Sequence, residues 1–149
     1  MKINHPISSI LYRKNPQVWS VSPEARVFDA IKLMAEKNIG ALPVMSGSRL
    51  VGIFTERDYT RKIALAGKNS RDTSVFEVAT AQCHSVSQHE TVEECMRLMT
   101  ENRVRHLPVM DGNQLIGIVS IGDLVDWTIS MQNVAIEQLE QYISGGVQA

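Results

Sequence analysis

The chain has 149 residues, enough for one compact domain or two small intertwined ones. Its formal net charge is −1 and its lysines and arginines are scattered, which argues against a surface for nucleic acid or acidic membranes. The two cysteines suggest no disulfide framework, the amino terminus lacks an apolar signal segment and no apolar run could span a bilayer, so we expect a soluble cytoplasmic protein.

Residues 1–17 are interpreted as an N-terminal segment that holds a short helix between Pro6 and Tyr12. The first folded unit, 18–66, begins with an extended segment at 18–20. Its first helix is predicted from one apolar face, which holds Val27, Ala30, Ile31, Met34 and Ala35. Two short apolar strands, 42–45 and 50–54, flank a turn that contains Gly47, and a second helix opens at Thr55.

Residues 67–82 are predicted to be a polar linker with a short helical segment. The second unit, 83–128, repeats the order of the first. It has an extended segment at 83–85, a helix, strands at 107–110 and 115–119, and a helix from Ser120. The apolar face of its first helix holds Val92, Cys95, Met96 and Met99, and Thr91 with Glu94 has the spacing of a capping box.

An internal repeat relates the two units. Residues 20–63 align with 85–128 at a constant offset of 65 positions, with 16 identities in 44 pairs. One unit alone has a sheet too small to be stable. The sequence therefore predicts an α+β fold, in which two pseudo-symmetric β-α-β-β-α repeats pack through their small sheets into a single core with two related clefts.

The last helix is predicted to run far beyond the second repeat, through 129–149, with a stop at Gly145-Gly146. Apolar residues continue along it at Val134, Ile136, Leu139 and Ile143. We expect its far end to pack on a second copy of the chain, as a homodimer. The alternative is a helix that folds back on its own domain.

Each half resembles a cystathionine-β-synthase (CBS) domain, and the pair resembles a stand-alone Bateman module. The resemblance is carried by two motifs that recur at the offset of 65, IGALPV (39–44) with GIFTERD (52–58) and VRHLPV (104–109) with GIVSIGD (117–123). It covers about 18–128. Each motif alone is weak, and their duplication within the expected elements makes the match specific.

The resemblance implies a regulatory module rather than an enzyme. In that family, the clefts between repeats bind AMP, ADP, ATP, NAD(H) or S-adenosylmethionine, and binding is signalled to a partner by conformational change. That partner is unknown here. The sequence shows no nucleophile–base pair and no G-x-x-x-x-G-K loop, and it is too short for the catalytic barrel of the inosine-monophosphate dehydrogenases, which share the domain.

Thr55 with Asp58, and Ser120 with Asp123, stand where a strand becomes a helix. A hydroxyl and free backbone N–H groups at a helix start can receive a phosphate, and a carboxylate one turn later can accept hydrogen bonds from ribose hydroxyls. The resemblance assigns the aspartates to ribose and the hydroxyls to phosphate. The alternative is a plain helix cap, with the aspartate complementing the helix dipole.

Arg105 and His106 have no basic counterpart in the first repeat, where Gly40 and Ala41 stand. By the resemblance, one cleft combines Arg105 and His106 with Thr55 and Asp58, and adenine lies along Cys83 and His84. The opposite cleft combines Ser120, Asp123, Val18, Trp19, Gly40 and Ala41. It lacks the basic pair, so it would hold a less charged group, bind weakly or stay empty. The alternative for Arg105 and His106 is a surface ion pair or an interface contact.

Three further interpretations complete the candidates. Trp19 could stack on adenine, although an aromatic residue beside a strand is more often core or interface. Cys83, His84 and His89 match no zinc spacing, so we expect no metal. A dimeric scaffold with vestigial clefts is the alternative to a nucleotide sensor, and substituting its aspartates would cost only a helix cap, about 1 kcal/mol.

Overall fold

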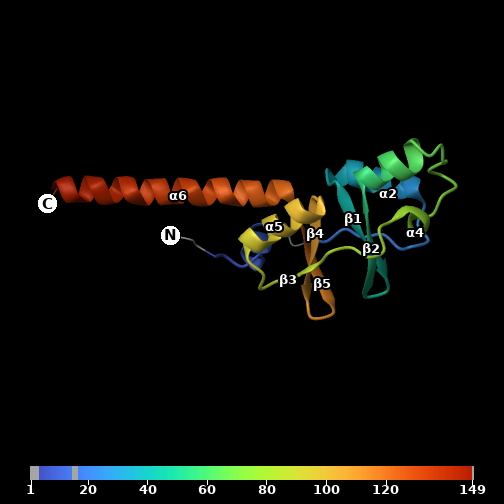
Figure 1. The fold of residues 1–149 in the computed structure, drawn as a ribbon, viewed down its shortest axis with the longest axis horizontal. Helices are drawn as coiled ribbons and strands as arrows, with labels where there is room; N and C mark the ends of the chain where they lie inside the picture. Colours follow the sequence, from blue (N-terminus) through green and yellow to red (C-terminus); the bar gives the residue numbers. More distant parts are fainter. Residues whose placement is uncertain (1–3, 15–16, 149) are drawn as a thin grey trace.

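The structure is a computed structural model that describes residues 4–14 and 17–148. Its elements follow the predicted order of two repeats with a long last helix (Figure 1). The elements are α1 (Ser8–Arg13), α2 (Val27–Lys37), β1 (Ala41–Ser46), β2 (Arg49–Thr55), α3 (Glu56–Asp58), the π-helix η1 (Tyr59–Ala64), α4 (Val75–Val78), β3 (Val86–Ser87), α5 (Val92–Asn102), β4 (His106–Asp111), β5 (Gln114–Ser120) and α6 (Ile121–Gln148). The predicted α+β class is confirmed.

Two antiparallel hairpins form the centre of the repeats, β1 with β2 and β4 with β5. Their turns place Gly47 at φ 61° and Gly112 at φ 59°, a left-handed conformation that glycine adopts without strain. Both hairpins carry a register shift at the equivalent place, directly after Val44 and directly after Val109. The offset of 65 therefore relates the two repeats even in the position of this irregular strand pairing.

The predicted first strands, 18–20 and 83–85, are wrong in position. In the first repeat the residue that joins the sheet is Val21, which makes an isolated bridge parallel to Val44, and in the second repeat the strand is Val86–Ser87, parallel to β4. Val86 is buried, and Val21 packs against the core of the first repeat. The apolar residue that joins each sheet therefore lies just beyond the predicted strand, and 17–19 and 82–84 lie outside the sheets.

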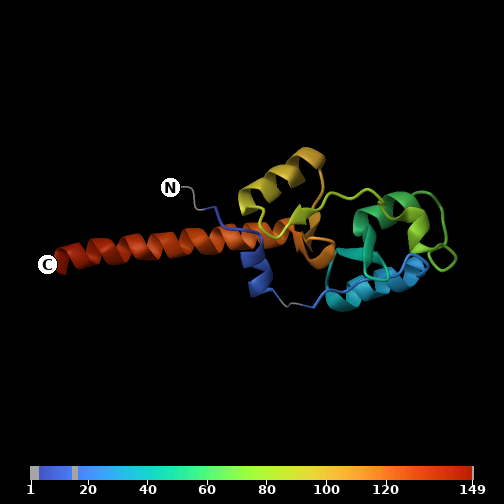
Figure 2. The ribbon, with the colours of Figure 1, turned by 90° about the horizontal axis from the view of Figure 1, so that it is seen from below.

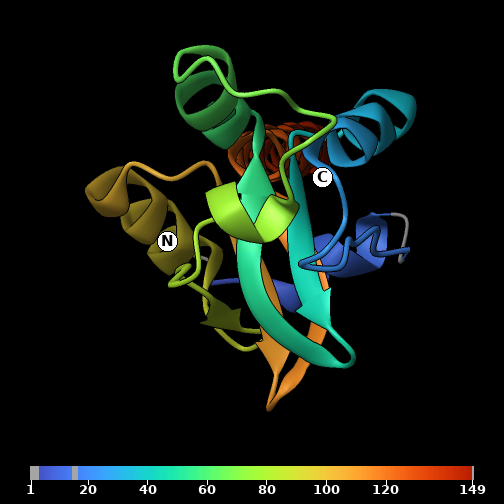
Figure 3. The same cartoon turned by 90° about the vertical axis from the view of Figure 1, so that its right-hand side faces the viewer.

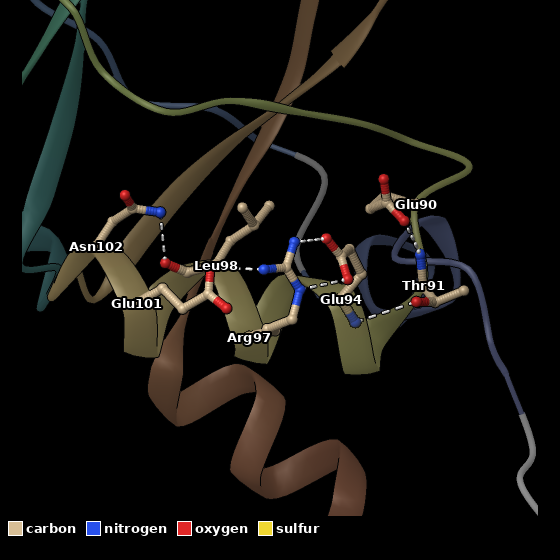
Figure 4. Close-up of polar contacts among 7 residues, drawn as sticks. All are labelled: Glu90, Thr91, Glu94, Arg97, Leu98, Glu101 and Asn102. Carbon is tan, nitrogen blue, oxygen red and sulfur yellow. Dashed lines mark hydrogen bonds and ion pairs between the residues drawn. The ribbon is translucent and has the colours of Figure 1, made fainter.

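Helices α2 and α5 bury the predicted face only in part. Ala35 is exposed, while Ile31 and Met96 are half-buried. The capping box predicted for α5 forms only on one side, since the Glu94 amide donates to Thr91 Oγ1 at 3.1 Å and the Thr91 amide donates to Glu90 instead. Figure 4 shows why: the Glu94 carboxylate accepts from Arg97, which also reaches Glu101. Asn102 closes the same exposed face by donating to the Leu98 carbonyl.

The repeats have two hydrophobic cores, so the expected single core is wrong. The first core gathers residues of α2, β1, β2, η1 and α4, and the second gathers residues of α1, β3, α5, β4, β5 and α6. The hairpins face each other between these cores, with β2 against β5 (Figure 3). The sheets do pack on each other, but each sheet also forms a separate core with the helices that cover its outer side.

The short helix that precedes each repeat packs on the other repeat. Ile7 and Ile10 at α1 are buried in the second core, where the Ile7 amide donates to the Glu90 carbonyl at 2.7 Å. Val75 and Val78 of α4 are buried in the first core, where the Val75 amide donates to the Ala25 carbonyl at 2.8 Å. The connections from α1 to the first repeat and from α4 to the second therefore cross between the repeats.

Helix α6 is a continuous helix that leaves the body of the molecule (Figures 1 and 2). Its first turns bury Leu124 and Trp127 in the second core, and from Gln132 to Gly145 every residue is exposed. The predicted stop at Gly145-Gly146 is wrong, since the helix continues to Gln148. The alternative in which it folds back on its own domain is also wrong.

Among the described residues, no helix is both long and apolar enough to cross a bilayer.

Gly52 and Gly117 occupy equivalent positions of the two repeats, but the atoms that an added Cβ would meet differ between them. A Cβ at Gly52 would lie 2.8 Å from the Thr80 carbonyl oxygen, which is backbone, and one at Gly117 would lie 2.7 Å from Leu11 Cδ2, the end of a flexible side chain. We expect Gly52→Ala to lower the free energy of unfolding by about 1–3 kcal/mol, and Gly117→Ala to lower it by less, because only Leu11 can move aside. Urea unfolding of both variants checks this, and an equal or larger loss in Gly117→Ala would contradict it.

Candidate functional site

The first cleft, of about 400 Å³, lies between the α3–η1 segment, the 80–84 connection and the residues that lead into β4. It brings together one predicted set of binding residues completely: Thr55, Asp58, Cys83, His84, Arg105 and His106. The connection that crosses from α4 to the second repeat forms one wall of this cleft.

The second cleft, of about 500 Å³, is formed in the equivalent way by the connection that leaves α1. It brings together the other predicted set: Val18, Trp19, Gly40, Ala41, Ser120 and Asp123. Residues 17–19 and 82–84, which overlap the strands predicted from the sequence, therefore line the clefts. They belong to the connections that cross between the repeats and do not pair in the sheets.

Asp58 forms a complete capping box with Thr55. Its Oδ2 accepts from the Thr55 amide at 3.0 Å and from Thr55 Oγ1 at 3.1 Å, and its own amide donates to Thr55 Oγ1 at 3.2 Å. Oδ1 accepts from Lys62 Nζ at 3.0 Å and from Thr80 Oγ1 at 3.4 Å. The helix-cap role is therefore real, and it occupies one carboxylate oxygen, while the other accepts from two side chains, Lys62 and Thr80.

The helix starts offer fewer backbone donors than expected. The Glu56 amide donates to the Gly40 carbonyl at 3.1 Å, and the equivalent Ile121 amide donates to the Arg105 carbonyl at 2.8 Å. With the Asp58 amide also taken by Thr55, two of the first N–H groups of α3 already have protein acceptors. A phosphate in the first cleft would have to be recognised mainly by side chains.

Asp123 repeats the capping box at the start of α6. Its Oδ2 accepts from the Ser120 amide at 2.8 Å, and its amide donates to Ser120 Oγ at 3.1 Å. The same Oδ2 accepts from Lys14 Nζ at 2.6 Å, and Lys14 also donates to the Ile118 carbonyl at 3.0 Å. Sequence reasoning missed Lys14 because it precedes the aligned repeat and its equivalent at the offset of 65 is Ala79.

The two clefts differ in charge. The first is lined by four cationic side chains, Arg57, Arg61, Lys62 and Arg105, and by two carboxylates, Glu56 and Asp58. Among the described residues, the second is lined by one lysine and one carboxylate, Lys14 and Asp123, and otherwise by apolar and neutral polar groups and His106. The expected asymmetry is present, although Lys14 gives the second cleft a cation that was not foreseen.

His106 lies between the clefts and lines both of them. A Cβ placed on Gly40 would lie 3.4 Å from the His106 ring, so this glycine makes room for the imidazole. Burial lowers the pKa of His106, and nearby Lys14, Arg105 and Arg57 lower it further, while Asp123 acts in the opposite direction. Arg105 is exposed and forms no ion pair with another described residue, so the surface ion-pair alternative gains no support.

The remaining candidates show no sign of catalytic or metal chemistry. Burial raises the pKa of the Cys83 thiol, which disfavours the nucleophilic thiolate. Within 4–14 and 17–148, no three His, Cys, Asp or Glu side chains are grouped to hold a metal ion. Trp19 lines the second cleft and carries Lys37 Nζ 4.1 Å from its ring centre, so it is neither fully buried in the core nor free of contacts.

A family model described as the CBS domain matches residues 7–65 and 74–130. The chain belongs to the CBS-domain family. Both matches begin at a leading helix, since the first includes α1 and the second includes α4.

Relatives extend this assignment. A putative signal-transduction protein with CBS domains from Burkholderia ambifaria is 48% identical, with a TM-score of 0.82 over 85% of this chain and 95% of that one. The mitochondrial CBS domain-containing protein CBSX3 of Arabidopsis thaliana is 39% identical over 134 residues, which are 87% of this chain and 65% of that protein. A CBS-domain pair solved with 5′-methylthioadenosine and S-adenosyl-L-methionine shares the fold, at 21% identity and a TM-score of 0.76 over 87% of this chain and 99% of that one.

The lowered pKa of His106 predicts how stability depends on pH. The unfolded chain takes up this proton near the ordinary histidine pKa of about 6.5, before the folded protein does, so acidification through that value favours unfolding. When the pH is lowered from about 8 to about 5.5, we expect the free energy of unfolding to fall less in His106→Gln than in the unsubstituted protein. Urea unfolding at both pH values measures the difference. An identical pH dependence in the two proteins would show that His106 is not held neutral by the fold.

Proposed function

We propose that this CBS pair is a regulatory module that senses an adenine nucleotide and has no catalytic activity of its own. One observation carries the proposal: the buried Asp58 carboxylate shares the first cleft with four cationic side chains, Arg57, Arg61, Lys62 and Arg105. A nucleotide needs a hydrogen-bond acceptor for its ribose hydroxyls and cations for its phosphates, and here both lie within one cavity of about 400 Å³.

The contacts of Asp58 suggest how the ligand enters. Its Oδ2 is used by Thr55, so the ribose hydroxyls would donate to Oδ1, where Lys62 now lies at 3.0 Å. The Lys62 side chain is partly exposed, and its Nζ also donates to the Val78 carbonyl at 3.0 Å. In this proposal Lys62 exchanges these two contacts for a phosphate, near Arg61 and Arg105, which also line the cleft. Thr55 would mainly hold Asp58 in place, and adenine would lie along Cys83 and His84.

The second cleft suits an adenosine compound with less negative charge, because the one lysine or arginine among its described lining residues, Lys14, is paired with Asp123. A CBS-domain pair of the same fold was solved with 5′-methylthioadenosine and S-adenosyl-L-methionine, two adenosine compounds without phosphate, which supports a ligand of this class. AMP, ADP, ATP and NAD(H) carry phosphate and belong to the first cleft in this proposal, which does not choose among them.

The output of the sensor would be a conformational change read by a partner protein. A ligand can produce that change only if it binds two arrangements of the repeats with different affinity. The crossing connections are suited to this, because each one lines a cleft and joins the two cores. The free cysteines suit a reducing compartment such as the cytoplasm.

Thermal unfolding against AMP, ADP, ATP, NAD, NADH and S-adenosylmethionine, with GMP as the control ligand, tests the first cleft. At about 100 times Kd, we expect a phosphate-bearing adenine compound to raise Tm by roughly 5–10 °C. Asp58→Asn and Arg105→Met should abolish the rise. Asp123→Asn is the matched control, since it alters the equivalent capping box of the other cleft and should retain the rise.

The scaffold alternative has one observation in its favour, namely that both aspartates already have protein partners. It predicts no rise in Tm with any compound at millimolar concentration, and that result would reject the sensor. A rise that survives Asp58→Asn but is lost in Asp123→Asn would move the phosphate-bearing ligand to the second cleft and contradict the assignment made here.

Lys14 gives a separate prediction for the second cleft. Because Lys14 donates to the capped Oδ2 of Asp123 and so partly neutralises the carboxylate whose other oxygen a ribose would use, Lys14→Met should increase the affinity for 5′-methylthioadenosine by about threefold to fivefold. Calorimetric titration of both proteins measures this, with Lys37→Met as a control that removes a cation next to Trp19 and leaves Asp123 unchanged. A lower affinity in Lys14→Met would show that Lys14 is itself a ligand-binding group.

A further inference from the structure

Helix α6 carries an exposed apolar stripe with the spacing of a coiled coil. Positions alternate by four and three residues along 125, 129, 132, 136, 139 and 143. In heptad notation, the a positions are Ile129, Ile136 and Ile143, and the d positions are Val125, Gln132 and Leu139. The five apolar members of this stripe are between 48% and 60% exposed.

The stripe faces away from the domain to which the helix belongs. Leu124, Trp127 and Met131, which pack on the second core, occupy the c and f positions on the opposite side of the helix. Val125 and Ile129 are therefore exposed even where α6 lies against its own domain. A partner helix could contact the stripe from Val125 onward, with each domain on the outer side of the pair.

The projecting part of α6 lacks the usual supports of an isolated helix. Beyond Met131 it has 17 residues, 132–148, close to the length at which isolated helices are marginal in water. Ile121–Gln148 contains no lysine or arginine, so no i,i+4 ion pair can form along it, and Gly145 and Gly146 weaken it further. Packing of the apolar stripe is the contribution that remains to keep it helical.

We propose that two copies of this chain associate through α6 as a parallel, in-register, two-stranded coiled coil. Isoleucine at all three a positions with leucine at d, as at Leu139, favours two parallel strands. The positions that flank the seam create no like-charge contact in this arrangement, since the g residues Thr128 and Ala135 would face the e residues Asn133 and Glu140 of the second copy.

Gln132 sets the direction and register of the two helices. It is the one polar residue among these six seam positions. In a parallel, in-register pair, each Gln132 lies beside its own counterpart, and the two amides can donate and accept between them. An antiparallel pair centred near Ile136 would place Gln132 against apolar seam residues and leave its amide without a partner.

Sedimentation equilibrium on the full chain tests the association. We expect a particle of twice 16.6 kDa. Ile136→Glu should weaken the association by about 100-fold or more, since it buries an unpaired charge at the seam. Val134→Glu is the matched control, because it introduces the same charge at an exposed apolar f position, and it should leave the dissociation constant nearly unchanged. A monomeric unsubstituted chain, or a dimer that tolerates Ile136→Glu, overturns the proposal, provided that thermal unfolding shows the domain of the variant intact.

Cysteine cross-linking tests the orientation in the background Cys83→Ser, where the remaining Cys95 is buried. Gln132→Cys and Leu139→Cys are made separately and oxidised. A parallel, in-register pair cross-links at both positions. An antiparallel pair can bring at most one of them to its own counterpart, because they lie about 10 Å apart along the helix. Cross-linking at only one position, or at neither, rejects the parallel arrangement.

Discussion

Both clefts depend on the packing of each leading helix against the opposite repeat. Because Ile7 and Ile10 complete the second core while Val75 and Val78 complete the first, the chain must cross between the repeats twice. The described parts of these crossings, 17–19 and 82–84, form walls of the two clefts. If the leading helices packed on their own repeats, residues 17–19 and 82–84 would not be placed opposite Asp123 and Asp58.

The two aspartates combine a folding role with the proposed binding role. The aspartate amides donate to the Thr55 and Ser120 hydroxyls, and the Thr55 and Ser120 amides donate to the aspartate carboxylates, which fixes each carboxylate at the junction of strand and helix. Such fixing is what a ribose site needs, because a carboxylate that is already ordered loses little entropy when a ligand arrives. The competing amines, Lys62 and Lys14, hold the carboxylates in the free protein and differ in origin. Lys62 belongs to the same helical segment as Asp58, whereas Lys14 comes from the crossing connection.

The repeat offset of 65 made much of the fold and of the site predictable. It located both hairpins and both hydroxyl–aspartate pairs at the helix starts, because each of these features is local to a repeat and occurs twice. The division of the candidate binding residues between two clefts came from the family resemblance, since each cleft combines residues of both repeats. The crossings could not be predicted in this way. They depend on contacts between the repeats, which a pattern within one repeat does not contain. The extended segments were expected to be strands but line the clefts, and a single core was expected where the leading helices complete two. Lys14 was missed because it lies outside the aligned region. The length of α6 was predicted, but Gly145 did not stop it, since a glycine ends a helix only where a left-handed residue or a tertiary contact favours the turn.

The two clefts have different mechanical connections to the rest of the molecule. The helical segment that contains Asp58 begins at Glu56, is short, has a π-helical turn from Tyr59 to Ala64, and ends within its own repeat. The helix that contains Asp123 begins at Ile121, runs for 28 residues and carries the seam of the proposed coiled coil. A ligand that displaces the first turn of α6 would therefore act on the second copy of the chain through a rigid element about 40 Å long. A ligand in the first cleft has no such helix, and it could reach the other cleft only through shared groups such as His106 and Gly40. Under the proposed function, the two clefts therefore differ in output as well as in charge. A phosphate-bearing ligand in the first cleft would act within one chain. A less charged ligand in the second cleft could act on the second copy through α6.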